Sequence, residues 1–352
     1  MGSRIRESHH PTSLFVLTVL AILSSASFWK AQKINEDVLA FTRSSTSQTT
    51  CVDSSLTSGK SAQARNDGPV IVNTDLVTLI VSVTDGSDHC IAGLDRSAFT
   101  IFDGKIPQEI SFFSDADAPI SIAIVLDVSG SMSGEKIRQA REAVVRFMKT
   151  SLDADEYFLI VFNQQPQLLL EGTRDSKAVL DKLSAAEPQG STALFDACYV
   201  AVERLSRGAY SKRVLLLISD GQDNNSRYGL SETRQLLRES EVMVYSIGIA
   251  DPIQLTGKAG ARIRHTLEGL AEITGGKAFY PRHAEKMDET FEEIALELRS
   301  QYSIGYRPRD FTSDGKWHRI KVKVSPPSGT NHLSVRSRAG YYAIRDLGGK
   351  RP

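Results

Sequence analysis

The sequence predicts an α/β fold: a doubly wound, mostly parallel sheet with helices on both faces, inserted in a small β-sandwich built from N- and C-terminal strands. Three observations lead to this prediction. Within residues 118–300, apolar strand-like runs alternate with segments of helical periodicity, as a parallel sheet with crossover helices requires. Residues 70–117 and 301–347 instead show period-two strands. Each β segment is too small for its own core, so we expect the two to pair.

Composition limits the functional classes. The chain has 352 residues, enough for more than one domain, with 41% hydrophobic and 24% charged residues, as in ordinary globular proteins. Lys and Arg together number 42, as do Asp and Glu, so the net charge is zero. This balance argues against a nucleic-acid-binding protein that depends on phosphate contacts.

Residues 1–30 are expected to be a signal peptide or signal anchor. Arg4 and Arg6 precede the apolar run Leu14–Leu23, and small residues up to Ala26 follow, which is the layout of an export signal. We therefore expect an extracytoplasmic protein, either periplasmic or secreted.

The segment after the signal leaves two points open. Phe28-Trp29-Lys30 is typical of an interfacial anchor, so an uncleaved signal that anchors the protein in the inner membrane remains an alternative. Residues 31–69 are rich in Ser and Thr and are expected to form a disordered linker. Cys51 and Cys90 could pair in an oxidising compartment, whereas Cys198 falls in a helix-like run and is expected to pack as a small apolar residue.

The N-terminal β segment, residues 70–117, begins with the alternating strand Val77–Val83 and a turn at Thr84-Asp85-Gly86. The stretch "AFTIFDGKIPQEISFF" then predicts two short strands joined near Asp103-Gly104.

The α/β domain, residues 118–300, follows. Its expected strands are Ser121–Leu126, Tyr157–Phe162, Val214–Ile218, Val242–Ile249 and Lys277–Tyr280, with Gln167–Leu170 as a hairpin partner of the second. Its expected helices are Glu135–Lys149, Leu194–Leu205, Ser231–Glu239, Ile263–Ile273 and Met287–Leu298. Ser231 is a candidate N-cap, and Gly275-Gly276 is a C-cap signal.

The C-terminal β segment, residues 301–347, contains the expected strands Tyr302–Tyr306, Ile320–Val324, His332–Arg336 and Tyr341–Ile344, before a short tail at 348–352. Its arginines, Arg336, Arg338 and Arg345, are expected to point outward from strands. Both ends of a doubly wound domain should emerge together, far from its ligand crevice, which permits its insertion into the sandwich.

Polar residues follow the ends of two of these buried strands. In "SIAIVLDVSGSMSGEK", Asp127 ends a continuous apolar strand, and Asp220 closes "VLLLISDG". Thr192, in "QGSTALFD", lies just before a helix. Ligands of open α/β sheets bind beyond the carboxyl ends of the strands. Two carboxylates and three hydroxyls should therefore meet there, from Asp127, Ser129, Ser131, Thr192 and Asp220. Such an all-oxygen set suits Mg²⁺.

The run Asp127-Val128-Ser129-Gly130-Ser131 resembles the DxSxS signature of von Willebrand factor type A domains and integrin I domains, and Thr192 and Asp220 match the remaining positions of their metal-ion-dependent adhesion site. The resemblance covers about 180 residues. It implies that Ser129, Ser131 and Thr192 bind Mg²⁺ or Mn²⁺ through hydroxyls, and that the two aspartates act partly through water. One coordination position would remain for an Asp or Glu of a partner protein, in a binding module without enzymatic activity.

The whole layout also resembles a group of secreted von Willebrand A-related proteins best known from Acidobacteria. The shared features are the signal, the A domain and the stretches "VSVTDG", "GLDRSAFTIFDGKIPQEISFF", "LRSQYSIGYRPRD", "DGKWHRIKVKV" and "VRSRAGYYA". The second acidic pair of integrin β chains is missing, because Gly134-Glu135 stands at that place.

Four other interpretations compete with this one. Asp127 and the two serines could simply cap a helix. Ser133 and Lys136 match the S-x-x-K of serine acyl-transfer enzymes, although no K-T-G element follows and Lys136 is expected to be a solvated helix residue. Asp127 could be a phosphoryl-transfer nucleophile, but Ser129 stands where a second Asp is usual. Finally, the module could be a structural subunit of an envelope assembly. Asp223-Asn224-Asn225 is expected to form a loop after Asp220, with at most a weak role in shaping the binding face.

Overall fold

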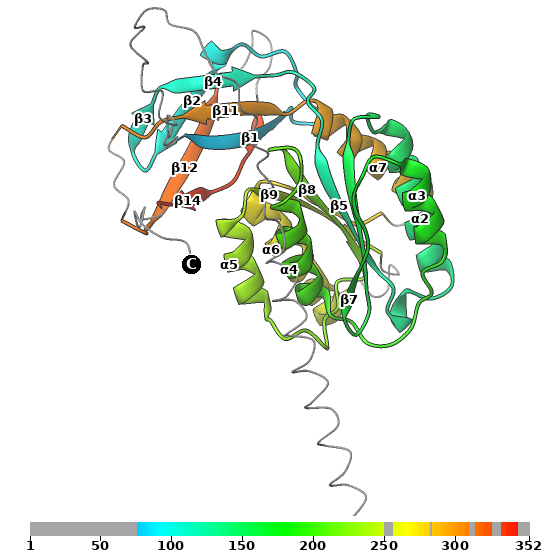
Figure 1. Ribbon diagram of the computed structural model, residues 1–352. Coiled ribbons are helices and arrows are strands. Elements are labelled where there is room, and N and C mark those ends of the chain that lie inside the picture. Colours follow the sequence, from blue (N-terminus) through cyan, green and yellow to red (C-terminus); the bar gives the residue numbers. More distant parts are fainter. Residues whose placement is uncertain (1–75, 250–255, 282–283, 310–313, 326–331, 344–352) are drawn as a thin grey trace, which may run out of the picture. The chain divides into compact units, whose positions relative to one another are not determined.

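The computed structural model describes residues 76–249, 256–281, 284–309, 314–325 and 332–343, all within one compact unit. Its centre is a six-stranded sheet in the order β10-β9-β8-β5-β6-β7 (Figure 1). All neighbouring strands are parallel except β6 and β7, which form an antiparallel hairpin. The strands are β5 (Ser121–Asp127), β6 (Glu156–Phe162), β7 (Pro166–Thr173), β8 (Arg213–Ser219), β9 (Val242–Gly248) and β10 (Ala278–Phe279).

Helices cover both faces of this sheet (Figure 1). One face packs against α2 (Glu135–Thr150), α3 (Ser176–Ser184) and α7 (Ala284–Arg299), and the other against α4 (Leu194–Leu205), α5 (Leu230–Glu239) and α6 (Gly257–Ala271). Every residue of β5 is buried. Ile122, Ile124 and Leu126 enter the first core, whereas Ala123 and Val125 enter the second. A strand covered on both faces has no polar side, which explains its continuous apolar run.

The remaining strands form two four-stranded antiparallel sheets, ordered β13-β1-β11-β4 and β14-β12-β2-β3. They are β1 (Val77–Thr84), β2 (Phe99–Asp103), β3 (Ile106–Gln108), β4 (Ile110–Ser114), β11 (Tyr302–Tyr306), β12 (Trp317–Val324), β13 (Ser334–Arg336) and β14 (Gly340–Tyr342). Each sheet contains strands from before and after the α/β domain. Their apolar faces share one core, in which the rings of Phe99 and Tyr302 lie 4.8 Å apart. The predicted fold class is therefore confirmed, including the insertion into a sandwich.

The two ends of the α/β domain emerge side by side. Ser114, the last residue of β4, pairs with Ser303 near the start of β11. Asp155, just before β6, accepts a hydrogen bond from the backbone N–H of Ile120 at 3.0 Å and pairs with Arg299 at the end of α7. Both connections thus lie at the amino end of β5, opposite its carboxyl end.

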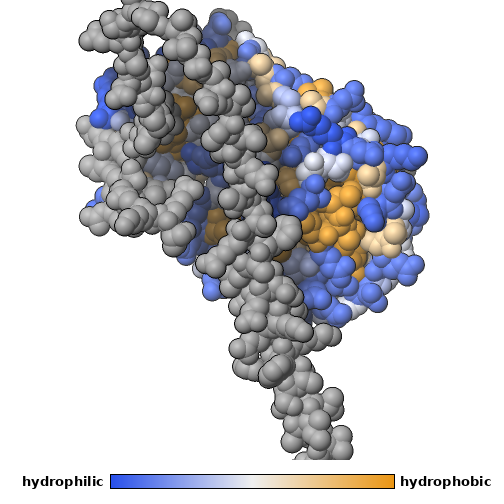
Figure 2. All heavy atoms as spheres, viewed as in Figure 1, coloured by the Kyte–Doolittle hydropathy of each residue, from blue (hydrophilic) through white to orange (hydrophobic). Residues whose placement is uncertain are grey.

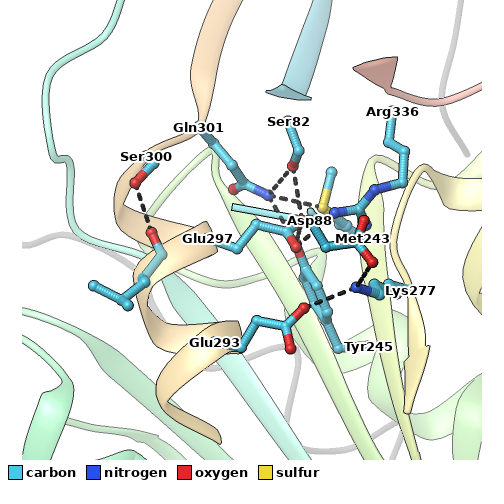
Figure 3. A network of polar contacts seen from close by, with 11 residues as sticks. Ser82, Asp88, Met243, Tyr245, Lys277, Glu293, Glu297, Ser300, Gln301 and Arg336 are labelled. Atoms are coloured by element: carbon cyan, nitrogen blue, oxygen red, sulfur yellow. Dashed lines mark hydrogen bonds and ion pairs between the residues drawn. The ribbon is translucent and has the colours of Figure 1, made fainter. Parts of the chain in front are cut away.

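A buried polar network joins the domain to the sandwich (Figure 3). The Glu297 carboxylate of α7 is 2% exposed and accepts hydrogen bonds from Ser82 of β1 (2.8 Å), Tyr245 of β9 (2.5 Å) and Arg336 of β13 (2.6 Å). Gln301 donates to both the Ser82 and Tyr245 hydroxyl oxygens. The prediction that Arg336 points outward is therefore wrong, because a buried carboxylate requires a charged partner. Arg338 is also largely buried, beside Glu241, and Arg345 lies outside the described residues.

Several helix predictions need correction. Helix α5 begins at Leu230, and its N-cap is Gly229 rather than Ser231; the Glu232 carboxylate accepts the Gly229 N–H at 2.7 Å. Helix α6 begins six residues before the predicted Ile263 and ends at Ala271, where the 3-10 helix η4 (Glu272–Thr274) takes over. Its first turns contain small and basic residues without apolar periodicity, so the pattern starts late. Helix α3 was not predicted at all.

The strand predictions differ mainly at their ends. The first β segment contains three strands after β1 instead of two, because the chain crosses from β3 in one sheet to β4 in the other at Glu109. The predicted strand Lys277–Tyr280 shortens to β10, and Val242–Ile249 ends at Gly248. The hairpin turn at Gly104 is confirmed, with φ of 60°.

Hydrophilic side chains dominate the visible surface, with apolar areas between them (Figure 2). Within the described ranges, the large apolar side chains that are more than a third exposed are Ile106, Phe112, Leu152 and Leu296. None of the described helices is long and apolar enough to cross a membrane. The expected signal and linker, residues 1–69, lie outside the described residues, as does Cys51. Cys90 forms no disulfide with another described residue, and Cys198 is a buried apolar contact, as predicted.

Candidate metal centre

Three loops meet at the carboxyl end of β5. The first runs from Asp127 to Ser131, the second contains Gly190 and Thr192 before α4, and the third follows Ser219 at the end of β8. The backbone N–H of Gly130 donates to the Gly190 carbonyl at 3.0 Å, which joins the first loop to the second. Strand β5 lies between β6 and β8, and the chain moves to β6 first and to β8 later, so this is the switch point of the sheet.

Asp127 is fully buried, and hydrogen bonds fix both of its carboxylate oxygens. Oδ1 accepts the Ser129 backbone N–H at 2.9 Å, and Oδ2 accepts the Ser219 hydroxyl at 2.6 Å. Burial raises the pKa of Asp127 to about 6, and the nearby charge of Asp220 adds to the rise, while the hydrogen bonds from Ser129 and Ser219 oppose it. A nearby cation would remove this penalty on the charged form.

The two serines of the first loop differ in their access to solvent. Ser129 is buried, whereas Ser131 is exposed, and their hydroxyl oxygens lie 3.1 Å apart. Ser129 is the N-cap of the 3-10 helix η3 (Gly130–Met132), which contains Ser131, so the short helical turn keeps the two hydroxyls close together. The centre is therefore buried on the aspartate side and open to water at Ser131.

The backbone of Thr192 is held by Asn224 and Asn225. Its N–H donates to the Asn224 side-chain oxygen at 2.8 Å, and its carbonyl accepts the N–H groups of Asn224 and Asn225, both at 3.0 Å. Thr192 itself is 3% exposed. These contacts join the second loop to the third, as Ser219 joins the third to Asp127.

Asp220 is also fully buried and has donors on both oxygens. The Gln222 backbone and side-chain N–H groups lie 3.3 Å from Oδ1 and Oδ2 respectively. The ammonium of Lys136 lies 3.7 Å from Oδ2, and its side chain is only 14% exposed. The prediction of a solvated Lys136 is therefore wrong: the first turn of α2 brings this side chain into the centre.

The loop after Asp220 is fastened to the first turn of α4. Asp223 accepts the Phe195 N–H at 3.2 Å, and buried Asp196 accepts the N–H and Nε–H of Arg227, both at 2.9 Å. Sequence reasoning gave Asp223 at most a weak role in shaping this face. The same weak role was given to Asn224 and Asn225, whereas Ser219 and Lys136 were missed, although the serine directly before Asp220 in "ISDG" was a visible signal.

The donor set fits a hard cation that takes oxygen ligands. Within the described parts of the chain, no group of three or more His, Cys, Asp and Glu side chains is placed to hold a metal ion. The centre offers two carboxylates, so a bound cation would take its other protein ligands from the serine and threonine hydroxyls. Neutral hydroxyls suit Mg²⁺ or Mn²⁺, which accept oxygen donors and keep water ligands, and disfavour softer metals.

A family model for the von Willebrand factor type A domain matches residues 121–294, about half of the chain. Residues 121–294 form a von Willebrand factor type A domain. The match spans β5 to α7, and it includes all three loops of the centre.

Curated and solved proteins also resemble this chain over parts of its length. Inter-alpha-trypsin inhibitor heavy chain 4 of Mus musculus is 36% identical over 138 residues, which cover 34% of this chain and 14% of the mouse protein. The chain thus spans about a seventh of that relative. A von Willebrand factor type A structure from Catenulispora acidiphila is 13% identical, with a TM-score of 0.44 and coverage of 78% and 76%. The corresponding domain of the type V pili tip protein Mfa5 from Porphyromonas gingivalis is also 13% identical, with a TM-score of 0.41 and coverage of 51% and 96%.

Proposed function

We propose that this chain is an extracytoplasmic protein-binding module in which Mg²⁺ or Mn²⁺ bridges to an Asp or Glu of a partner protein. Its ligands would be Asp127, Ser129, Ser131, Thr192 and Asp220. One observation supports this most strongly: two buried carboxylates and three hydroxyl residues lie on adjoining loops at the switch point of the sheet, and the only exposed one of the five is Ser131. Type A domains generally mediate protein–protein interactions. A bound cation would act there as a Lewis acid toward an anionic oxygen.

Neighbouring residues orient the two carboxylates of the proposed site. Ser219 and the Ser129 N–H hold the Asp127 carboxylate in one orientation, and Gln222 does the same for Asp220. Because donors already contact these oxygens, a role of the aspartates partly through water is supported. A hollow of about 310 Å³ beside the centre, lined by Val128, Asn163 and Gln189 among others, leaves room for neighbouring side chains of a partner.

The same contacts favour binding over catalysis. Type A domains of related proteins are generally not enzymes. Asp127 would be a poor phosphoryl-transfer nucleophile, since hydrogen bonds engage both of its oxygens. The S-x-x-K interpretation needs Lys136 as a base, but its ammonium pairs with Asp220.

Metal-dependent thermal stability tests this proposal. A ligand selective for the native state stabilises it by about 2.7 kcal/mol at a hundred times its Kd, so Mg²⁺ should raise Tm relative to chelator. Asp127→Ala and Thr192→Ala should lose the shift, and Asp181→Ala, which removes an exposed carboxylate of α3, should keep it. An equal shift in wild type and Asp127→Ala would rule out this centre.

Capture from the native cell envelope tests the partner. We expect the wild-type protein to retain a protein ligand in Mg²⁺ and to release it in chelator, and Asp127→Ala to retain none. A reporter that is active only after export, fused behind residues 1–75, checks the extracytoplasmic location, and activity confined to the cytoplasm would contradict it.

A further inference from the structure

Lys136 places a positive charge against a buried carboxylate of the metal centre. Its ammonium is 3.7 Å from Asp220 Oδ2, and the two side chains are 14% and 0% exposed. Water and salt screen a buried pair far less than an exposed one, so this charge acts strongly on whatever occupies the centre.

The local fold fixes this placement. Gly134 has φ of 69°, a conformation that suits glycine, and it is the N-cap of α2, which starts after only two residues beyond η3. Lys136 is the second residue of that helix, so its side chain returns toward the loop that contains Ser131. The neighbouring Glu135 does not neutralise the charge of Lys136, because its carboxylate is exposed and pairs with Arg138 on the outer side of the helix.

The two aspartates therefore differ in their surroundings. Neutral donors, the Ser129 N–H and the Ser219 hydroxyl, hold Asp127. Asp220 accepts hydrogen bonds from the neutral Gln222 and, in addition, lies beside the ammonium of Lys136. Two carboxylates alone would neutralise a divalent cation completely. With Lys136 beside them, the loaded centre keeps a net positive charge.

We propose that Lys136 is a built-in counter-cation of Asp220, which weakens the hold of the centre on the divalent ion and strengthens the hold of the loaded centre on an anionic partner group. This inference rests on the proposed function. It deepens that function, because Lys136 would be the residue that makes the metal-loaded centre bind a carboxylate in preference to water.

The test compares wild type with Lys136→Met, which keeps the length and apolar stem of the side chain and removes its charge. Calorimetric titration with Mn²⁺ should show Kd lowered about tenfold in the variant. Titration with acetate at saturating Mn²⁺ should show the opposite change, with binding weakened by a similar factor. Lys136→Gln, whose polar end preserves solubility, is measured alongside, and Lys136→Arg should restore both wild-type values.

Arg138→Met is the matched control, because it removes a cation from the same helix that pairs only with the exposed Glu135 and Glu142 among the described residues. Both of its affinities should equal those of wild type. Equal Mn²⁺ affinities in wild type, Lys136→Met and Lys136→Gln would overturn the inference alone. A lack of Mn²⁺ binding in wild type and in every Lys136 variant would overturn the proposed function and the inference with it.

Discussion

Asp127 carries a titrating carboxyl group where water does not reach. Its folded pKa of about 6 lies above the ordinary value of 3.8, mainly because burial disfavours the charged form. Between these two pH values the native protein binds more protons than the unfolded chain does. Without metal, this group therefore stabilises the fold below pH 4, and its contribution is lost as pH rises through about 6.

Asp127→Asn should thus stabilise the metal-free protein at neutral pH. The asparagine has no charge to bury, so its advantage over wild type should grow from pH 4 to pH 7 and reach up to roughly 3 kcal/mol. Urea unfolding in chelator at several pH values measures the difference. Saturating Mg²⁺ should reverse the order at pH 7, because only wild type gains the metal. A difference between the two proteins that did not change with pH would contradict the assignment.

The sequence predicted the five residues that we propose as ligands, but not the side chains that hold them. Asp127, Ser129 and Ser131 follow one strand in a recognisable spacing, and Thr192 and Asp220 follow from the parallel-sheet rule. Ser219, Asn224 and Lys136 contact residues that lie 32 to 92 positions away in the sequence, and the contact of Lys136 also depends on where α2 begins. Those depend on register and helix phase, which composition and periodicity leave open.

At the scale of single elements, the Gly275-Gly276 pair does more than end a helix. Gly275 has φ of 85° and ends η4, as its sequence signature suggested. A Cβ on Gly276 would lie 1.9 Å from the carbonyl oxygen of Val244, and one on Gly275 would lie 2.4 Å from the backbone of Ser337. Both glycines therefore allow backbones of different elements to approach closely.

Gly276→Ala should destabilise the protein severely, by about 3 kcal/mol or more, because the obstructing atom belongs to the backbone of β9 and cannot rotate away. Chemical denaturation measures the loss, and reduced soluble expression should accompany it. Gly86→Ala is the control: nothing lies within 4 Å of its added Cβ, so its stability should stay within about 0.5 kcal/mol of wild type. If the two variants were equally stable, this close approach would not exist in solution.

Helices and strands were predictable where the apolar residues of the sequence are strongly periodic, and they were missed or misplaced where that periodicity is weak. Strand β5 and helix α2 have clear apolar patterns and appear nearly as expected. Helix α3 buries only Val179 and Leu183 over nine residues, too few for a distinct pattern, although Asp175 caps it by accepting two backbone N–H groups. The N-cap of α5 was misplaced because Glu232, not a hydroxyl residue, satisfies the free N–H there.

At the scale of the whole molecule, the Glu297 network joins the type A domain to the sandwich. Arg336→Met should leave Glu297 buried without its cation and cost about 3–5 kcal/mol. Replacing both, in Glu297→Leu/Arg336→Met, should recover much of that loss, because the buried charge disappears. Urea unfolding of the two single variants and the double variant measures the coupling. Additive losses would show that the two residues do not interact.

Two chain connections, not one, attach the type A domain to the sandwich, and this has a mechanical consequence. They run side by side, where Ser114 pairs with Ser303, and β5 separates them from the candidate metal centre by about 20 Å. A single tether lets a domain swivel, whereas a double tether resists torsion. A force on a partner bound at the carboxyl end of β5 would act along the central strands and load both connections in parallel. The tension would then reach the sandwich with little rotation of the type A domain.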